Sequence, residues 1–131
     1  MKTATLAICT NKKTEILFFS AIWLFSSMGI ISVYITFPTE AAAKKLSGYL
    51  IQERIVACAN LFPINSCYWW KEAVQTEKEW AGLLKTKAAL WPLLVATVED
   101  IHPYEVPCIV KTTASANPAY EDWIRSNVRN V

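Results

Sequence analysis

Residues 56–85, VACANLFPINSCYWWKEAVQTEKEWAGLLK, decide the fold. The stretch 56–70 is rich in strand-forming residues, and residues 76–85 return as a second long strand. Joined through residues 71–75, the two strands form a β-hairpin. Because proline cannot donate to a strand ladder, Pro63 predicts a bend or bulge in the first strand.

Strand and helix patterns alternate on both sides of this hairpin. Short β-type runs predict strands, and apolar residues three and four apart predict helices. The expected elements are strands over residues 32–37 and 108–113 and helices over residues 40–53, 87–101 and 119–128. The order β-α-β-β-α-β-α predicts an α+β domain, a ferredoxin-like β-α-β-β-α-β sandwich with a C-terminal helix.

Helix ends and apolar faces support these assignments. Thr39 is the expected N-cap of the first helix, and Pro92 and Pro118 stand at the starts of the other two. The faces expected to be buried are Ala42, Ala43, Leu46, Tyr49 and Leu50; then Leu90, Leu94, Val98 and Ile101; and finally Tyr120, Trp123, Ile124 and Val128.

The N-terminal part, residues 1–31, differs from the rest. Residues 16–31, ILFFSAIWLFSSMGII, form an uncharged apolar run. As a helix it would span about 24 Å, short of a hydrocarbon core of about 30 Å. It therefore predicts a signal-peptide core or short signal anchor ahead of a domain over residues 32–131, in the secretory pathway or at a membrane. The alternative is an extra helix packed on the domain or on an oligomer of a cytoplasmic protein.

Composition disfavours two broad classes of function. A net charge of +2 and the lack of a basic, aromatic-interleaved stripe argue against a nucleic-acid partner. The chain has no G-x-S-x-G, P-loop, HExxH or dinucleotide glycine pattern and only three glycines, so we do not expect an enzyme.

The four cysteines, Cys9, Cys58, Cys67 and Cys108, show no zinc-knuckle or CxxC spacing. We expect reduced, buried, structural cysteines, with a disulfide or a metal role as the alternative.

Five stretches together resemble the CutA family of divalent-cation tolerance proteins over about residues 33–128. They are residues 54–60 (RIVACAN), Tyr68-Trp69-Trp70, Glu79 six residues before Lys85-Thr86, residues 102–107 (HPYEVP), and Asn117-Pro118-Ala119-Tyr120 leading into Asp122-Trp123-Ile124. The resemblance implies a ferredoxin-like protomer in a homotrimer whose hairpin strands extend sheets across subunits. The family's acidic-glycine-basic turn is replaced by Lys71-Glu72-Ala73.

The residues themselves give an independent reason to expect an oligomer. Trp69, Trp70 and Trp80 lie on a hairpin that is too long for one small protomer to cover. An exposed aromatic strand edge invites aggregation, and pairing with other copies in a closed ring removes that edge.

The resemblance also implies copper or another divalent cation as a ligand. Some bacterial members are associated with copper through a first-strand cysteine and two adjacent histidines. Here Ile35 and Ile101 occupy two of those positions, which leaves His102 as the one candidate ligand and predicts weak binding. The alternative is a polar His102 that lines a cleft between subunits.

Further positions are implied at a pocket or interface: Trp69, Trp70, Glu79, Lys85, Tyr104, Glu105, Tyr120 and Trp123. Glu79 and Lys85 have even spacing, so both point to one face of their strand. The polar members would form a small-ligand or cation pocket, or instead a salt-bridged interface that fixes the trimer register.

Two function classes follow. One is a homotrimeric protein of the divalent metal ion response. The other is a non-enzymatic scaffold of a membrane-protein complex, because animal members of the family with apolar leaders are associated with membrane complexes and acetylcholinesterase processing.

Overall fold

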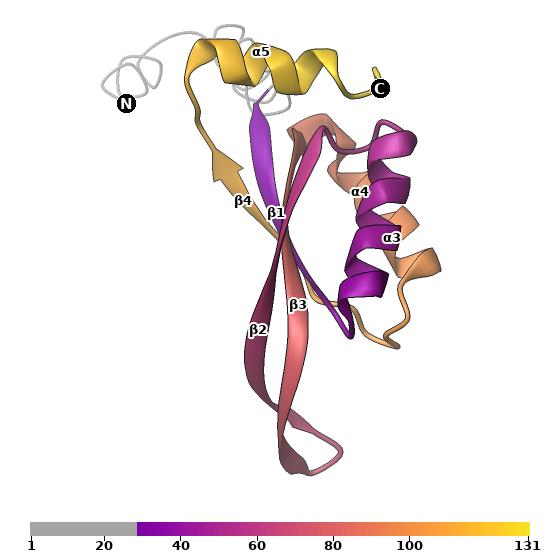
Figure 1. The fold of residues 1–131 in the computed structure, drawn as a ribbon. Coiled ribbons are helices and arrows are strands. Elements are labelled where there is room, and N and C mark those ends of the chain that lie inside the picture. The colour runs from indigo at the N-terminus through magenta and orange to yellow at the C-terminus, as the bar shows by residue number, and fades with distance from the viewer. Residues whose placement is uncertain (1–28) are drawn as a thin grey trace, which may run out of the picture.

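The computed structural model describes residues 29–131. Its elements are β1 (Ile30–Phe37), α3 (Glu40–Gln52), β2 (Cys58–Trp70), β3 (Ala73–Lys87), the short 3₁₀ helix η1 (Ala88–Leu90), α4 (Trp91–Ile101), β4 (Ile109–Ala114) and α5 (Pro118–Ser126). The antiparallel sheet has the order β2-β3-β1-β4. Helices α3 and α4 cover one face, and α5 lies across the end opposite the hairpin tip (Figure 1). The predicted α+β ferredoxin-like fold is confirmed.

The first strand begins two residues earlier than predicted. Ile30 pairs with Lys87 and Ala114, and both Ile30 and Ile31 are buried. The end of the apolar run therefore belongs to the sheet. The rest of the predicted leader lies outside the described residues, and among residues 29–131 no helix is long and apolar enough to cross a membrane.

The main core lies between the sheet and the two helices on its face. Side chains alternate across a strand, so every second residue of β1 enters this layer. Its largest fully buried members are Phe37, Ile35, Leu50, Leu84, Leu94, Val33, Val56 and Val98. A second cluster, with Ile30, Leu90 and Ile124 at its centre, fixes α5 to the end of the sheet.

The predicted N-cap is confirmed, because the Thr39 hydroxyl accepts a hydrogen bond from the Ala42 amide at 3.1 Å. The expected apolar faces are too wide. Tyr49, Ile101 and Trp123 remain 46%, 40% and 44% exposed, since only a narrow stripe of each helix meets the sheet. The second helix begins at Trp91 rather than at residue 87, because β3 continues to Lys87 opposite Ile30.

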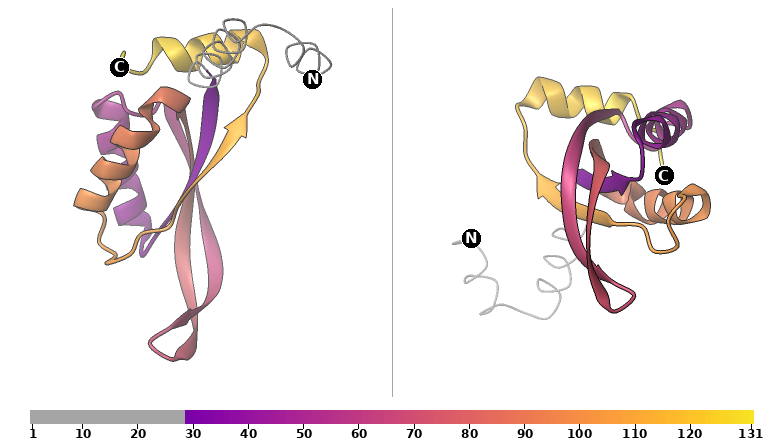
Figure 2. Two further views of the ribbon diagram at one scale, coloured as in Figure 1. Left: turned by 180° about the vertical axis from the view of Figure 1, so that it is seen from behind. Right: turned by 60° about the horizontal axis from the view of Figure 1, so that its bottom comes forward.

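The hairpin is more regular than predicted, with a shorter first strand and a longer second strand. Pairing runs without a shift from Cys58 opposite Lys85 to Trp70 opposite Ala73. Of the bend or bulge expected at Pro63, the bulge is therefore wrong. Pro63 pairs with Trp80 on an edge strand, where a missing amide hydrogen is tolerated. Beyond the other elements the two strands continue as a twisted ribbon (Figure 2).

The turn has two residues instead of the five predicted. Lys71 and Glu72 take φ angles of 49° and 63°, the left-handed region that two-residue hairpin turns require. Such turns usually contain glycine or asparagine, and other residues are disfavoured there by about 1 kcal/mol each. Strand pairing, rather than turn chemistry, must therefore hold the tip together.

Candidate functional site

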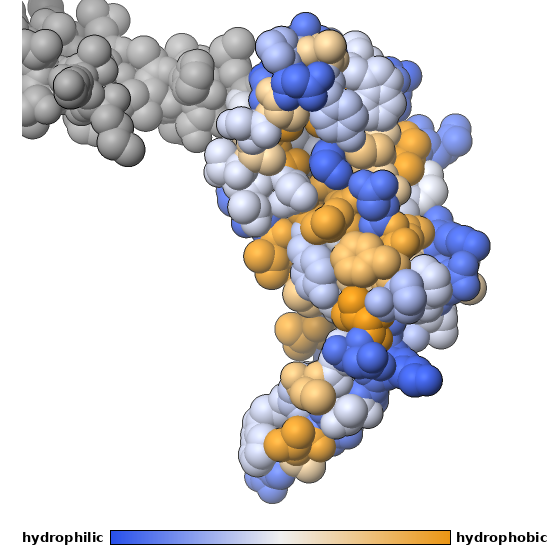
Figure 3. Space-filling view, turned by 60° about the vertical axis from the view of Figure 1, so that its left-hand side comes forward, coloured by the Kyte–Doolittle hydropathy of each residue, from blue (hydrophilic) through white to orange (hydrophobic). Residues whose placement is uncertain are grey.

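One face of the sheet has no helix layer over its middle, and we call it the open face. Strand register places Tyr34, Phe62, Leu83 and Val110, one from each strand, on this face. Figure 3 shows hydrophobic side chains gathered among polar ones on this side of the molecule. Leu83 and Val110 are 36% and 52% exposed. Each of the four strands therefore contributes a large side chain to this face.

Next to this surface lies a hollow of about 890 Å³, bordered by the hairpin and the segment 104–108. Its wall includes Glu77, Glu79, Tyr68, Tyr104 and Cys108. Glu77, Glu79 and Tyr68 lie on the paired strands β2 and β3, whereas Tyr104 and Cys108 belong to the segment between α4 and β4.

Two tyrosines donate hydrogen bonds to two carboxylates in this hollow. The Tyr104 hydroxyl donates to Glu79 Oε2 at 2.8 Å, and the Tyr68 hydroxyl donates to Glu77 Oε2 at 2.8 Å. Burial, followed by the bond to Glu79, raises the pKa of Tyr104, while the bond to Glu77 raises the pKa of Tyr68 to about 12. Both phenols therefore remain donors at neutral pH.

His102 holds the segment that carries Tyr104. Its Nδ1 accepts the Tyr104 backbone amide at 3.0 Å, so the proton is on Nε2, which donates to the Thr36 carbonyl at 2.8 Å. The ring is 8% exposed and stacks on Phe37 with centroids 5.6 Å apart. Burial lowers its pKa, although the Thr36 bond and Glu79 oppose the shift. A neutral imidazole with both nitrogens occupied is a structural link between β1 and the hollow.

The predicted pocket and interface residues fall into two groups. Trp70, Glu79, Tyr104 and Glu105 meet at the hollow. Lys85 points to the same face of β3 as Glu79 but lies six residues, or about 20 Å, farther along that strand. It donates instead to Asn60 Oδ1 at 3.2 Å.

The other predicted residues lie away from the hollow. Tyr120 and Trp123 stack with centroids 5.7 Å apart on α5, and the Tyr120 hydroxyl lies 3.4 Å from Cys58 Sγ. Trp69, at the tip, does not line the hollow and is 69% exposed.

The prediction omitted Tyr68, Glu77 and Cys108 as members of the hollow. The even spacing of Glu77 and Glu79 was a signal that could have found one of them, since both leave β3 on the same side. Tyr68 reaches Glu77 only in the register that the two-residue turn imposes. Cys108 needed the three-dimensional path of the 102–108 segment.

Cys58, Cys67 and Cys108 are free thiols, as expected. The prediction that the cysteines are buried is wrong for Cys67, which is exposed, and Cys58 and Cys108 are half-buried. Cys67 faces outward because it lies on the hairpin ribbon, beyond the helices that cover the sheet. Cys9 lies outside the described residues.

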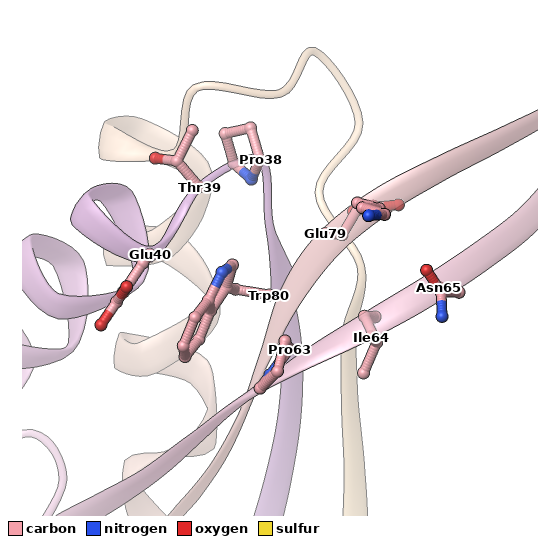
Figure 4. Close-up of a pocket in the computed structure, with 9 residues that line it drawn as sticks. Pro38, Thr39, Glu40, Pro63, Ile64, Asn65, Glu79 and Trp80 are labelled. Atoms are coloured by element: carbon pink, nitrogen blue, oxygen red, sulfur yellow. The ribbon is translucent and has the colours of Figure 1, made fainter.

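A smaller hollow of about 550 Å³ lies between the start of α3 and the hairpin. Figure 4 shows Trp80 directed toward this helix start, while Glu79 leaves β3 on the other side. Glu40 at its rim already pairs with Lys44 at 2.8 Å. Trp80 lines this hollow, but its lining residues include no histidine or cysteine that could act as a metal ligand or nucleophile.

The donor atoms of residues 29–131 do not form a copper site. Within residues 29–131 no three histidine, cysteine, aspartate or glutamate side chains lie close enough together to hold a metal ion. His102 would have to give up a hydrogen bond before either ring nitrogen could bind a metal.

The family model described as CutA1 divalent ion tolerance protein matches residues 31–127. The chain belongs to this family. It is 38% identical over 96 residues to the divalent-cation tolerance protein CutA of Pyrococcus horikoshii, covering 72% of this chain and 94% of that protein.

Solved CutA1 structures share the fold of this family member. The Oryza sativa structure has a TM-score of 0.77 at 34% identity, covering 81% of this chain and 99% of its own. The Pyrococcus horikoshii structure has a TM-score of 0.75 at 36% identity, covering 76% of this chain and 99% of its own.

The environment of His102 predicts a pH dependence of stability. Its folded-state pKa lies below the ordinary value of about 6.5, so protons bind more readily to the unfolded chain. The contribution of neutral His102 to the free energy of unfolding should therefore be complete above pH 6.5. It should decrease as the pH drops toward the folded-state pKa. Urea titrations at several pH values between 7.5 and 5 measure it.

His102→Gln serves as the control for this prediction. It removes the titrating group while it keeps a side chain that can hydrogen-bond, so the slope of stability against pH between 7 and 5.5 should flatten. An unchanged slope in His102→Gln would assign the pH dependence to other groups.

Proposed function

We propose that the chain acts as a homotrimer in the response to divalent metal ions and has no catalytic activity of its own. Its relatives in Pyrococcus horikoshii and Thermotoga maritima are divalent-cation tolerance proteins, which supports a role in the response to divalent metal ions. The open face is the observation that supports the assembly. It places exposed Leu83 and Val110 beside half-buried aromatic residues, with no element of residues 29–131 over them.

The edge of the sheet supports the same assembly. β2 is an edge strand of thirteen residues, so one row of its backbone groups has no strand partner within the described residues. Long unpaired edges pair readily with other chains. In a ring with cyclic symmetry, each copy can cover the strand edge and the apolar face of its neighbour, so that no edge is left unpaired.

Copper binding is the finer part of the proposal, and we propose that it is weak. Ile35 and Ile101 offer no donor atoms, and both nitrogens of His102 are engaged. A role in metal response would then depend on ligands that several copies supply together, or on an indirect effect of the trimer.

A second candidate is a scaffold of a membrane-associated complex. Its support is the exposed tip of the hairpin, where Trp69 and Val74 are 69% and 68% exposed. The apolar run 16–31 would place the domain close to a membrane or in the secretory pathway. Full-length protein that remains soluble, unprocessed and unaggregated in cell fractions would remove this candidate.

The trimer is tested by the mass of the full-length chain in solution. Light scattering after size-exclusion chromatography in mild detergent should return three times the chain mass. Leu83→Glu on the open face and Trp70→Ala at the hollow should shift the mass toward one chain, because buried interface anchors contribute about 2 kcal/mol or more.

Leu93→Glu is a matched control for Leu83→Glu, since both leucines are 36% exposed but Leu93 lies on α4. Its mass should stay that of the unsubstituted protein. A monomer at micromolar concentration for the unsubstituted chain would contradict the proposal, as would equal dissociation by the two leucine variants.

The copper proposal is tested by titration of Cu²⁺ into the full-length trimer. The affinity should be weak and should vanish in His102→Ala. Ile35→Cys with Ile101→His should raise it tenfold or more, because thiolate and imidazole together suit copper. Tight binding that survives His102→Ala would show that other residues hold the metal.

A further inference from the structure

Residues 118–131, which we call the C-terminal strap, comprise α5 and the chain that follows it. α5 has nine residues, and an isolated helix of this length is not stable in water. The strap buries Ile124 and Val128 in the smaller core cluster, against Ile30 and Leu90. Its folded state therefore depends on its contacts with the rest of the domain.

The strap ends beside the C-terminus of α3, where the chain turns into β2. The Arg54 amide donates to the Ile51 carbonyl at 3.0 Å. The next amide, that of Ile55, donates to the Leu50 carbonyl at 2.9 Å. This pair of bonds is the Schellman motif, which usually has glycine at its left-handed turning residue. Arg54 has a φ of 57°, so a residue with a long side chain occupies the glycine position.

The side chain of Arg54 gives a reason for this substitution. Its Nη2 donates to the Ser126 carbonyl at 3.1 Å, at the C-terminal end of α5. In return, the Arg129 guanidinium donates to the Glu53 carbonyl at the end of α3, at 3.0 Å from Nε and 2.6 Å from Nη2. The Arg129 amide also donates to the Arg54 carbonyl at 2.8 Å. Each helix therefore has a C-terminal carbonyl capped by an arginine from the other segment, where a cation is favoured.

We propose that the C-terminal strap opens as a unit while the sheet stays folded, with Arg54 and Arg129 as the latch that holds it closed. Both arginines are exposed, and the main core is built from residues 31–109, so the latch can open without disturbing that core. The closed strap covers the beginning of β1, and the open strap uncovers an apolar surface that includes Ile30 and Leu90. This conformational device depends neither on the proposed metal response nor on the proposed assembly.

Hydrogen exchange on the full-length protein tests whether the strap opens independently, because each amide reports the opening that exposes it. The amides of α5 should exchange faster than those of β1 and β3. Val98→Ala leaves a cavity in the main core, so it should speed exchange in β1 and β3 about tenfold and leave α5 unchanged. If Val98→Ala does not fold, low concentrations of urea replace it, since they promote openings in proportion to the surface exposed.

Two variants test the latch. Arg129→Gln should speed exchange in α5 by about threefold to tenfold, the range expected for lost hydrogen bonds of a charged group at the surface. Arg54→Gly should speed it similarly, because glycine keeps the backbone carbonyl but lacks the guanidinium. In β1 and β3, Arg54→Gly should have a smaller effect than Arg129→Gln. Glycine relieves the backbone strain at this position, and that strain is released on complete unfolding but not on opening of the strap.

Lys45→Gln is the control, since it removes an exposed positive charge from α3 and should leave exchange in α5 unchanged. Equal acceleration of α5 and the sheet by Val98→Ala or by urea would overturn the proposal, because α5 would then exchange only through complete unfolding. Unchanged exchange of α5 in Arg129→Gln and Arg54→Gly would overturn the latch. Protection of α5 that rises with protein concentration would also overturn it, since a neighbouring copy would then hold the strap.

Discussion

The pairing of β2 with β3 is the interaction on which the rest of this structure depends. It runs unbroken from Cys58 opposite Lys85 to Trp70 opposite Ala73, and it projects half of the hairpin beyond the helices. The proximal half forms the core with β1, α3 and α4. The distal half has no helix behind it, so its aromatic and acidic side chains are free to form surfaces. Assembly, as proposed, uses the outer edge of β2 along the whole hairpin together with the open face around Leu83 and Val110.

A chain of hydrogen bonds connects the core to the hollow. The Thr36 carbonyl accepts from His102, His102 accepts from the Tyr104 amide, and the Tyr104 hydroxyl donates to Glu79. The first and the last of these bonds join segments that are distant in sequence, and the middle one fixes the turn between His102 and Tyr104. The position of the Glu79 carboxylate therefore depends on a neutral imidazole packed on Phe37.

Local patterns predicted the order of elements, the Thr39 cap and the confirmed fold class, because these depend on periodicity and on short-range hydrogen bonds. The details of the hairpin could not be predicted in this way. Lys71 and Glu72 show none of the glycine or asparagine that indicates a two-residue turn, so a five-residue loop was the natural expectation. That error changes the register, and the register decides that Tyr68 meets Glu77. Glu79 and Lys85 were correctly placed on one face, but six residues of a strand also separate them by about 20 Å, which is too far for both to line one pocket.

The central claim is that other copies of the chain cover the outer edge of the hairpin. Hydrogen exchange on the full-length protein tests it most directly, because amides of β2 that point away from β3 can be protected by a neighbouring subunit but not by their own. The account predicts slow exchange for outward-pointing amides between residues 58 and 70 at concentrations that favour assembly, with protection lost in Leu83→Glu. Fast exchange of these amides in the assembled protein would contradict it.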